Sequence, residues 1–386
     1  MERYPAFDPP EYVQWEPDPT LQAAFRERLD SDPVRQEIVS SLSTEQLLEI
    51  YRDLLRTRLV DIGLKRWVRQ GVISKAWLGT GEEAVTVGSV YALDRARDMV
   101  YPMIRNAGAC HMMGMPLAQI FHGYLGTTES PNAGRDLHIG DLSRGVIQPV
   151  SQMGTNAAVT AGVALGFKTR GEDRVALTWV GDGATRTGIF HEGANLAAVE
   201  GVPAVFVLQD NQVALGTERA RHSRTSMTTL PGAYGVPFES CDGNHVLDVF
   251  AATVLATRPC REGGGPAMVV AETFRMGGHA THDEREGRST FPEELFREWG
   301  RRDPVGMYEE YLVEEGISRA TLGEVEASVK SGVEAAAKEA YEARFRLPPA
   351  EAAHFEGITD GGPLLSLELR PVRWGAENGG AENHRS

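Results

Sequence analysis

The chain has 386 residues, 41% of them hydrophobic and 24% charged, which is the composition of a globular protein with one large domain or two small ones. Its formal net charge of −15 argues against nucleic acid or an anionic membrane as a main partner. The spacing of the three cysteines matches neither a zinc motif nor a redox pair. No apolar run approaches the length of a membrane span, which needs about 18 residues.

The first 42 residues are acidic and rich in proline, and they predict an extended N-terminal arm that is either disordered or laid over a partner. Because they lack the pattern of a signal or transit peptide, and because the cysteines are few, the sequence predicts a cytoplasmic protein. The first regular element begins at Ser43, where Ser43 and Gln46 have the spacing of a capping box. Leucines at helical spacing follow, and Gly71 is the predicted C-terminal end of this helix.

A second capping box, from Thr80 to Glu83, predicts a helix to about Leu93. Residues 101–150 read as loop-rich. Beyond them, predicted helices alternate with short apolar strands. The strands are expected at 174–180, 203–209 and 266–272, and the helices at 153–167, 188–199 and 244–257, the last capped by Asn244.

This alternation is typical of an α/β fold, a doubly wound parallel sheet with helices on both faces. A surface helix is expected at 321–344, and a polar tail follows it. The predicted organisation is an arm over 1–42, a single α/β domain over 43–370 and a tail over 371–386.

Two predicted strands end in polar residues. The first runs into Gly181-Asp182-Gly183-Ala184, and the second into Asp210-Asn211. Because neighbouring parallel strands end at the same edge of a sheet, Asp182 and Asn211 could offer oxygens to one Mg²⁺ ion shared with a phosphate. Gly181 and Gly183 would let the backbone approach that ligand. The alternative is a tight turn in which Asp182 caps the next helix.

The segment GDGATRTGIFHEGANLAAVEGVPAVFVLQDNQVALGT, residues 181–217, resembles the alpha subunits of pyruvate and branched-chain 2-oxoacid dehydrogenases. The similarity extends over roughly residues 47–316, through several motifs in the same order. The resemblance implies the thiamine-diphosphate-binding fold, with thiamine diphosphate and Mg²⁺ as cofactors.

The resemblance also implies roles for individual residues. Mg²⁺ would be bound by the side chains of Asp182 and Asn211 and by the main-chain carbonyl of Val213. The cofactor-binding residues would be Arg105, Ser151, Met153, Gly181, Gly183, Ala184, Asn211 and His279. Gly183 and Ala184 would offer amides to the diphosphate and Arg105 its guanidinium, while Ser151 and Met153 would lie against the aminopyrimidine ring.

His279, in a glycine-rich loop after the third strand, is the expected catalytic residue, because a histidine can stabilise or protonate a carbanion-like intermediate. His138 is a secondary candidate, and His282 is left unassigned. Outside this context each residue has a plainer interpretation: a surface salt bridge for Arg105, a helix cap for Ser151 and an ordinary loop residue for His279.

Three positions depart from the family pattern. Ile104 replaces a tyrosine beside Arg105, Asp210 replaces the first asparagine of an Asn-Asn pair, and Ala280 replaces a regulatory serine. Kinase control at Ala280 should therefore be absent.

The function implied is oxidative decarboxylation of a 2-oxoacid, with transfer of the acyl group to lipoyl-lysine on an acyltransferase core. A beta subunit would complete the site in an α2β2 heterotetramer and supply the glutamate that activates the cofactor. Residues 81–89 and 134–138 look closer to the branched-chain enzymes than to the pyruvate enzymes, while pyruvate and acetoin stay open as substrates.

Two other functions stay open. A catalytically silent assembly or regulatory paralogue is suggested by Ile104 and Asp210. A nucleotide-binding dehydrogenase is disfavoured, because no GxGxxG motif follows the first buried strand.

Overall fold

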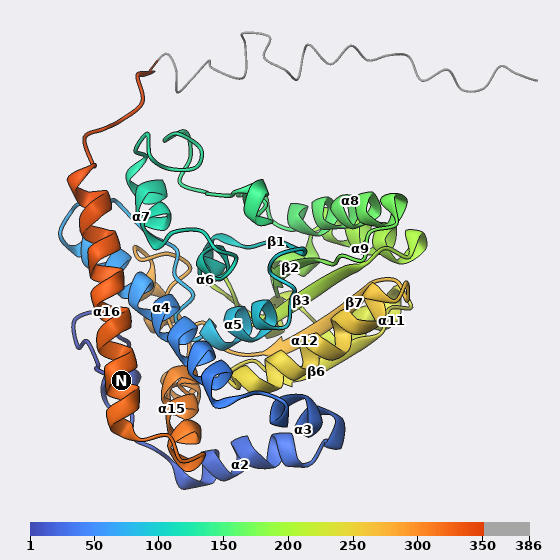
Figure 1. The fold of residues 1–386 in the computed structure, drawn as a ribbon, viewed down its shortest axis with the longest axis horizontal. Helices are drawn as coiled ribbons and strands as arrows, with labels where there is room; N and C mark the ends of the chain where they lie inside the picture. The colour runs from blue at the N-terminus through green and yellow to red at the C-terminus, as the bar shows by residue number, and fades with distance from the viewer. Residues whose placement is uncertain (351–386) are drawn as a thin grey trace, which may run out of the picture. The chain divides into compact units, whose positions relative to one another are not determined.

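The computed structural model describes residues 1–350, and a central parallel sheet organises them (Figure 1). Its five strands run in the spatial order β1-β2-β3-β7-β6. Their bounds are β1 (Met99–Tyr101), β2 (Ala176–Gly181), β3 (Ala204–Asp210), β7 (Ala267–Glu272) and β6 (Phe238–Asp242). Every pair of neighbours is parallel, which confirms the doubly wound sheet.

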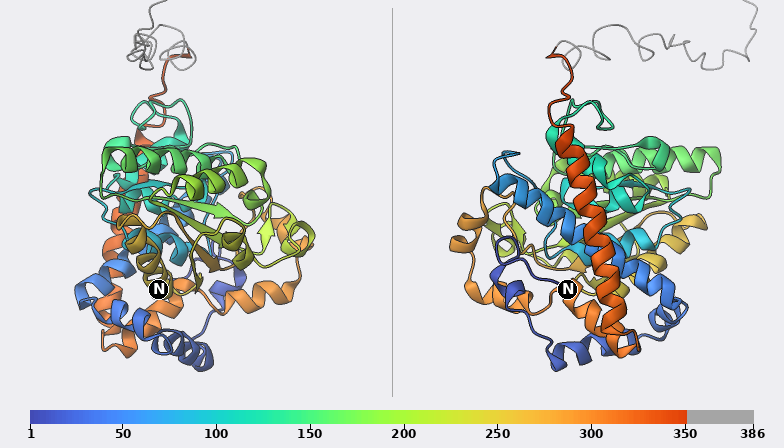
Figure 2. Two further views of the ribbon diagram at one scale, coloured as in Figure 1. Left: turned by 90° about the vertical axis from the view of Figure 1, so that its right-hand side faces the viewer. Right: turned by 60° about the vertical axis from the view of Figure 1, so that its left-hand side comes forward.

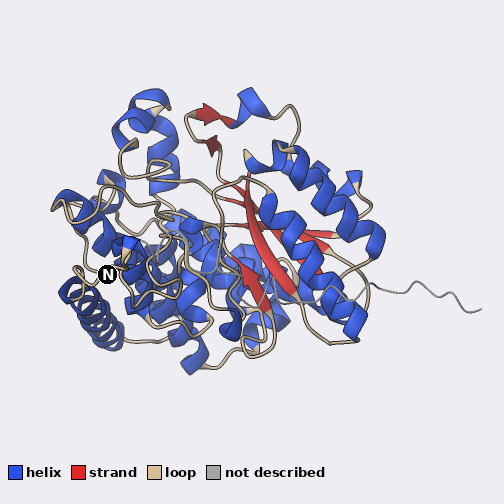
Figure 3. Ribbon diagram, turned by 90° about the horizontal axis from the view of Figure 1, so that it is seen from above, coloured by secondary structure: helices blue, strands red, loops and turns tan. Residues whose placement is uncertain are grey.

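Helices cover both faces of this sheet, as Figures 1 and 3 show. On one face α8 (Thr155–Arg170) and α9 (Gly188–Glu200) form a core with side chains such as Ala176 and Phe206. On the other, α4 (Thr44–Arg69), α5 (Glu83–Tyr91) and α12 (Val246–Arg261) pack with the alternate side chains, such as Leu177 and Val205. Strands buried on both faces explain the unbroken apolar runs in the sequence.

The remaining helices lie outside these two layers. They are α1 (Pro10–Val13), α2 (Pro19–Asp30), α3 (Pro33–Ser40), α6 (Gly108–Met112), α7 (Leu117–Leu125), α10 (Arg219–His222), α11 (Leu230–Ala233), α13 (Glu284–Thr290), α14 (Glu293–Gly300), α15 (Pro304–Glu314) and α16 (Arg319–Glu342). The predicted surface helix is α16, which packs against α4 and α7. A two-stranded antiparallel hairpin, β4 (Val213–Ala214) and β5 (Thr217–Glu218), follows β3.

Within residues 1–350, none of the helices combines the length and the hydrophobicity that crossing a membrane requires.

The N-terminal segment is not the extended arm that the prolines suggested. It contains α1, α2 and α3, which contact α14, α15 and α12 (Figure 2). Pro19 and Pro33 stand in the first turns of α2 and α3, where a missing amide hydrogen costs nothing, and Asp18 and Asp32 cap these helices. Residues 1–347 form one compact unit. The expected limit at residue 370 and the tail over 371–386 lie outside the described residues.

The helix caps were predicted with mixed success. The capping box of Ser43 and Gln46 is confirmed at the start of α4. The one expected from Thr80 to Glu83 is wrong, because Glu83 is buried and binds Arg58 instead. Asn244 is not the cap of α12; His245 is, and the Asn244 amide donates to the carbonyl of Arg302.

Candidate functional site

The carboxyl ends of β2 and β3 bring Asp182 and Asn211 to the same edge of the sheet. Gly181 and Gln209 are paired across the two strands, and the next residue, Asp182, donates its amide to the carbonyl of Gln209 at 3.1 Å. A cavity of about 280 Å³ opens at this edge. All the predicted metal and cofactor residues line it: Arg105, Ser151, Met153, Gly181, Asp182, Gly183, Ala184, Asn211, Val213 and His279.

Two residues that line this cavity each have a buried oxygen with no hydrogen-bond partner among the described residues: Oδ2 of Asp182 and Oδ1 of Asn211. The second polar atom of each side chain does form a hydrogen bond. Asp182 Oδ1 accepts from the amide of Gly183 at 2.7 Å, and Asn211 Nδ2 donates to Glu82 at 2.9 Å. His222 Nε2 lies 3.4 Å from Asp182 Oδ2, without hydrogen-bond geometry.

Leaving a buried polar atom unsatisfied costs about 1–3 kcal/mol, so such atoms need an explanation. Side-chain oxygens are the ligands that a hard cation such as Mg²⁺ prefers. Burial also raises the pKa of Asp182, a shift that a bound cation would oppose. The residues present therefore fit a divalent metal.

The loop after β3 is held in a strained shape around Val213. Gln212 and Leu215 have positive φ angles of 69° and 54°, which non-glycine residues rarely adopt. Arg275, from the loop after β7, donates to the carbonyls of Val213 at 3.4 Å and Leu215 at 2.8 Å. A Cβ at Gly183 would lie 2.5 Å from the Cβ of Ala214, so this close approach requires glycine.

Arg105 and His279 meet on another wall of the cavity. The guanidinium of Arg105 lies 3.2 Å from His279 Nδ1. Burial lowers the pKa of His279 to about 4, and the charges of Arg105 and Arg275 add to this effect. His279 is therefore neutral near pH 7, with Nδ1 as the acceptor and Nε2 carrying the proton.

Glu82 is a buried carboxylate that sequence analysis did not assign to the site. It is 1% exposed, and it accepts from Asn211 and Gln209 through Oε1 and from Arg105 through Oε2. Arg275 was missed as well. The one signal for Glu82 is a pair of glutamates at the start of an otherwise apolar helix, where a buried acid needs partners.

The other side of the cavity is open, and apolar side chains stand exposed there. Met153 is 55% exposed, Leu215 62% and Val150 46%. Ser151 is exposed too, and His138 lies on this rim, where its Nδ1 is 2.9 Å from Asp136. A cluster of exposed apolar residues beside a polar cavity is typical of a surface that another chain covers.

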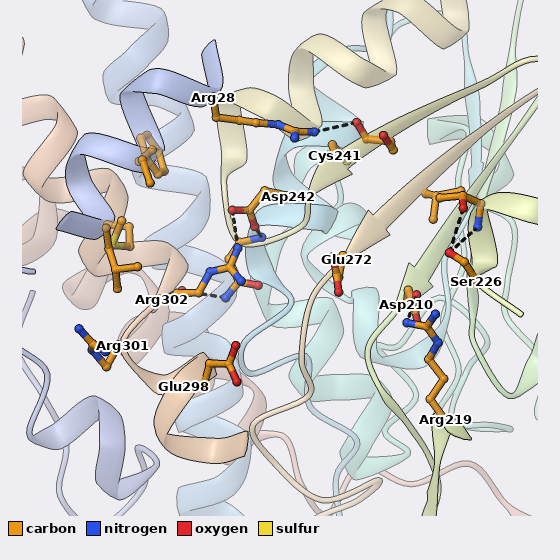
Figure 4. A pocket seen from close by; sticks show the side chains of 18 residues that line it. Arg28, Asp210, Arg219, Ser226, Cys241, Asp242, Glu272, Glu298, Arg301 and Arg302 are labelled. Atoms are coloured by element: carbon orange, nitrogen blue, oxygen red, sulfur yellow. Dashed lines mark hydrogen bonds and ion pairs between the residues drawn. The ribbon is translucent and has the colours of Figure 1, made fainter. Parts of the chain in front are cut away.

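A second cavity, of about 620 Å³, lies at the carboxyl ends of β3, β7 and β6 (Figure 4). Asp210 lines this cavity and pairs with Arg219 at 2.7 Å, so its charge is opposed. Burial raises the pKa of Asp210 to about 6. Arg302 pairs with Asp242 on the same wall. Of the predicted site residues, all of which fall within 1–350, none lines this second cavity.

Comparison with known proteins gives one consistent family. A family model described as "Dehydrogenase E1 component" matches residues 51–348. The chain is 32% identical over 321 residues to the pyruvate dehydrogenase E1 component subunit alpha of Staphylococcus epidermidis, an alignment that covers 81% of this chain and 82% of that protein. The protein of the same name from Staphylococcus aureus is 32% identical over 317 residues, covering 80% and 81%.

Proposed function

Because the chain belongs to the dehydrogenase E1 component family, as an alpha component of a 2-oxoacid dehydrogenase, we propose that the cavity at the ends of β2 and β3 binds thiamine diphosphate with Mg²⁺. The reaction proposed is oxidative decarboxylation of a 2-oxoacid, followed by acyl transfer to lipoyl-lysine. The observation that carries the proposal is the pair of unpartnered, buried oxygens of Asp182 and Asn211.

In this proposal the chain holds and orients its ligands. Thiamine diphosphate, when bound, supplies the carbon nucleophile and the electron sink for decarboxylation. Asp182, Asn211 and the carbonyl of Val213 would hold the metal. The amides of Gly183 and Ala184 and the guanidinium of Arg105 would bind the diphosphate, with Gly181 leaving room for it, while Ser151 and Met153 would lie beside the aminopyrimidine ring.

His279 would act as a hydrogen-bond donor in this site. Its Nδ1 accepts from Arg105, which leaves the Nε2–H group free to donate to a reacting oxygen of the substrate. With a pKa near 4, the imidazole would be neutral at pH 7, so it would stabilise developing charge through its Nε2–H hydrogen bond and would not act as an imidazolium acid.

The open, apolar rim supports a second chain as part of the site. We propose a beta subunit in an α2β2 heterotetramer, which would cover Met153 and Leu215 and contribute the carboxylate that activates the cofactor. The assembly would work in the cytoplasm and deliver its acyl group to a lipoyl acyltransferase core.

Separate observations support two substrates. The sequence of residues 81–89 and 134–138 favours a branched-chain 2-oxoacid, whereas the named relatives are pyruvate dehydrogenase subunits. Rates for the chain co-expressed with its beta subunit on 3-methyl-2-oxobutanoate, pyruvate and acetoin would separate these substrates.

The test of the site is cofactor binding by that same pair. Calorimetry should detect thiamine diphosphate binding that requires Mg²⁺, and Asp182→Ala and Asn211→Ala should each abolish it. Asp210→Asn, one residue away but lining the other cavity, is the matched control and should bind normally. Unchanged binding in both alanine variants would refute the proposed site.

Ile104 favours one alternative, a catalytically silent alpha subunit, because it lines the cavity without the hydroxyl of a tyrosine. Such a subunit would pair with the beta subunit and still fail to reduce an artificial electron acceptor when a 2-oxoacid is added.

A further inference from the structure

Glu82 lies behind the candidate metal site, where three donors converge on one carboxylate. Asn211 Nδ2 lies 2.9 Å and Gln209 Nε2 3.1 Å from its Oε1, and Arg105 Nη1 lies 3.3 Å from its Oε2. Each of these donors comes from a different segment of the chain than Glu82 itself, which precedes α5. A buried carboxylate surrounded by donors acts as an acceptor only.

This arrangement decides which way the Asn211 amide faces. An asparagine amide has a donor end and an acceptor end, and a carboxylate can pair only with the donor end. The opposite end, Oδ1, is therefore directed away from Glu82, and it is the buried oxygen without a partner. The reversed amide would lose its bond to Glu82 and turn an N–H group toward the proposed cation.

The neighbouring side chains fix Glu82 in turn. Gln209 donates to Glu82 through Nε2, and the Oε1 of Gln209 accepts from Asn106 Nδ2 at 3.1 Å. Asn106 Nδ2 also lies 2.8 Å from Thr86 Oγ1. Because all of these groups are buried, each bond restricts the orientation of the next, and the carboxylate has a single arrangement that satisfies its donors.

Glu82 also holds Arg105 against the cavity wall. The guanidinium spans Glu82 and His279, with Nη1 directed to the first and Nη2 to the second. An arginine fixed in this way loses less side-chain entropy when it binds an anion. The same carboxylate thus reaches a proposed metal ligand and a proposed phosphate ligand.

We propose that Glu82 is a positioning residue for the metal: its carboxylate fixes the Asn211 amide with Oδ1 toward the cation. This inference rests on the proposed function of the cavity. It concerns orientation, since Glu82 reaches the metal only through Asn211. A carboxylate needed simply as a counter-charge for Arg105 would have no bearing on which end of the amide faces the metal.

The experiment measures Mg²⁺ affinity in the alpha–beta pair, at a fixed, saturating concentration of thiamine diphosphate. Glu82→Gln should weaken Mg²⁺ binding by about 10- to 100-fold, the usual range for residues that orient a metal ligand. Glu272→Gln is the matched control, because it removes an exposed carboxylate from the neighbouring end of β7, in the other cavity, and it should leave the affinity unchanged.

A swapped pair separates orientation from charge. In the double variant Glu82→Gln with Asn211→Asp, the amide of the new glutamine can donate to the new aspartate, whose second oxygen still faces the metal. Gln209, which donates to the same oxygen of Glu82, would turn its own amide to accept from the new glutamine. Because the new aspartate is itself a charged ligand, the reference is Asn211→Asp alone, in which two carboxylates meet without a donor between them. Mg²⁺ affinity should be higher in the double variant than in Asn211→Asp. A role limited to balancing the charge of Arg105 predicts that the double variant binds Mg²⁺ no better than Asn211→Asp.

The outcomes distinguish the two proposals. If the wild-type pair shows no Mg²⁺-dependent binding of thiamine diphosphate, the proposed function fails and this inference with it. If the wild type binds and Glu82→Gln binds equally well, this inference alone is wrong. Should Glu82→Gln fail to fold, the double variant decides: tighter Mg²⁺ binding than in Asn211→Asp supports the inference, and equal or weaker binding by the folded double variant overturns it.

Discussion

His279 lies beside two guanidinium groups, and this environment controls its charge. Arg105 is 3.2 Å from its Nδ1, and burial with the charges of Arg105 and Arg275 lowers its pKa to about 4. Asp283 opposes this shift without reversing it. A histidine in such a setting serves as a neutral hydrogen-bonding group across the physiological pH range.

We expect a titration of isotopically labelled histidine, followed by NMR, to give His279 a pKa near 4, with His279→Gln used to assign its signal. Arg105→Gln should move this pKa upward, because it removes one of the repelling charges.

The low pKa of His279 also affects stability. Between pH 4 and about 6.5, His279 is protonated in the unfolded chain and neutral in the folded chain, so its contribution to stability rises with pH across that window. A titration midpoint near 6.5 in the wild type would contradict this environment.

The site residues that belong to motifs could be predicted from the sequence, whereas those that act through distant contacts could not. Asp182 and Asn211 each follow an apolar strand, so their meeting could be expected. Glu82 and Arg275 were missed, because their roles arise from bonds to Arg105 and Val213, far away along the chain. The glutamate pair at the start of an apolar helix indicates that a buried acid needs partners, but a single sequence does not say which residues these partners are.

Among the elements, burial determined what could be predicted. Strands β2, β3 and β7 are buried along most of their length and appear in the sequence as apolar runs. Strand β6 lies at the sheet edge, with Phe238 and Ser240 exposed, so its sequence FESCD lacks such a run. The N-terminal prolines were interpreted as an extended segment, although two of them stand where helices begin.

Helices α8 and α9 pack closely because Gly193 lacks a side chain. A Cβ at this position would lie 2.5 Å from the amide nitrogen of Ala158 and 2.8 Å from the carbonyl carbon of Ala157, both backbone atoms of α8. Since neither helix backbone yields easily, we expect Gly193→Ala to reduce the free energy of unfolding by about 1–3 kcal/mol.

Urea unfolding of the isolated chain would measure this change. Gly162→Ala is the matched control, because Gly162 stands in the middle of α8 with no heavy atom within 4 Å of an added Cβ. It should stabilise the chain by up to about 1 kcal/mol, through a less flexible unfolded state. Equal effects of the two substitutions would argue against close packing of the helices.

At the scale of the whole molecule, the N-terminal helices are part of the folded body. Tyr12 is fully buried, Phe25 stacks on His245, and Arg35 binds Asp248 and Glu239. Deletion of residues 1–42 should therefore lower the thermal midpoint and increase proteolysis of the isolated chain. An extended arm that touches only a partner would leave both unchanged, which is the outcome that would contradict this packing.

A buried ion network ties the same segment to the helices behind the site. Arg58 of α4 is fully buried and donates to Glu83 of α5 and to Asp303, the cap of α15. Arg3 also pairs with Asp303. Burial alone would raise the pKa of Asp303, but the charges of Arg58 and Arg3 outweigh burial and hold this pKa at about 2. Glu83 follows Glu82 directly, so the network also fixes the backbone beside the proposed metal site.

We expect Arg58→Met to lower the free energy of unfolding by about 3–5 kcal/mol, because it leaves Glu83 and Asp303 buried without their main partner. Arg52→Met, on the same helix but in a partly exposed pair with Glu45, should cost less than about 1 kcal/mol. Urea denaturation at pH 7 would measure both. The stability lost in Arg58→Met should become smaller as the pH falls. Without Arg58, the carboxylates of Glu83 and Asp303 gain protons more readily than Asp303 does in the wild type, and this relieves the unpaired charge. A loss no greater than that of Arg52→Met would mean that this network contributes little to holding α4, α5 and α15 together.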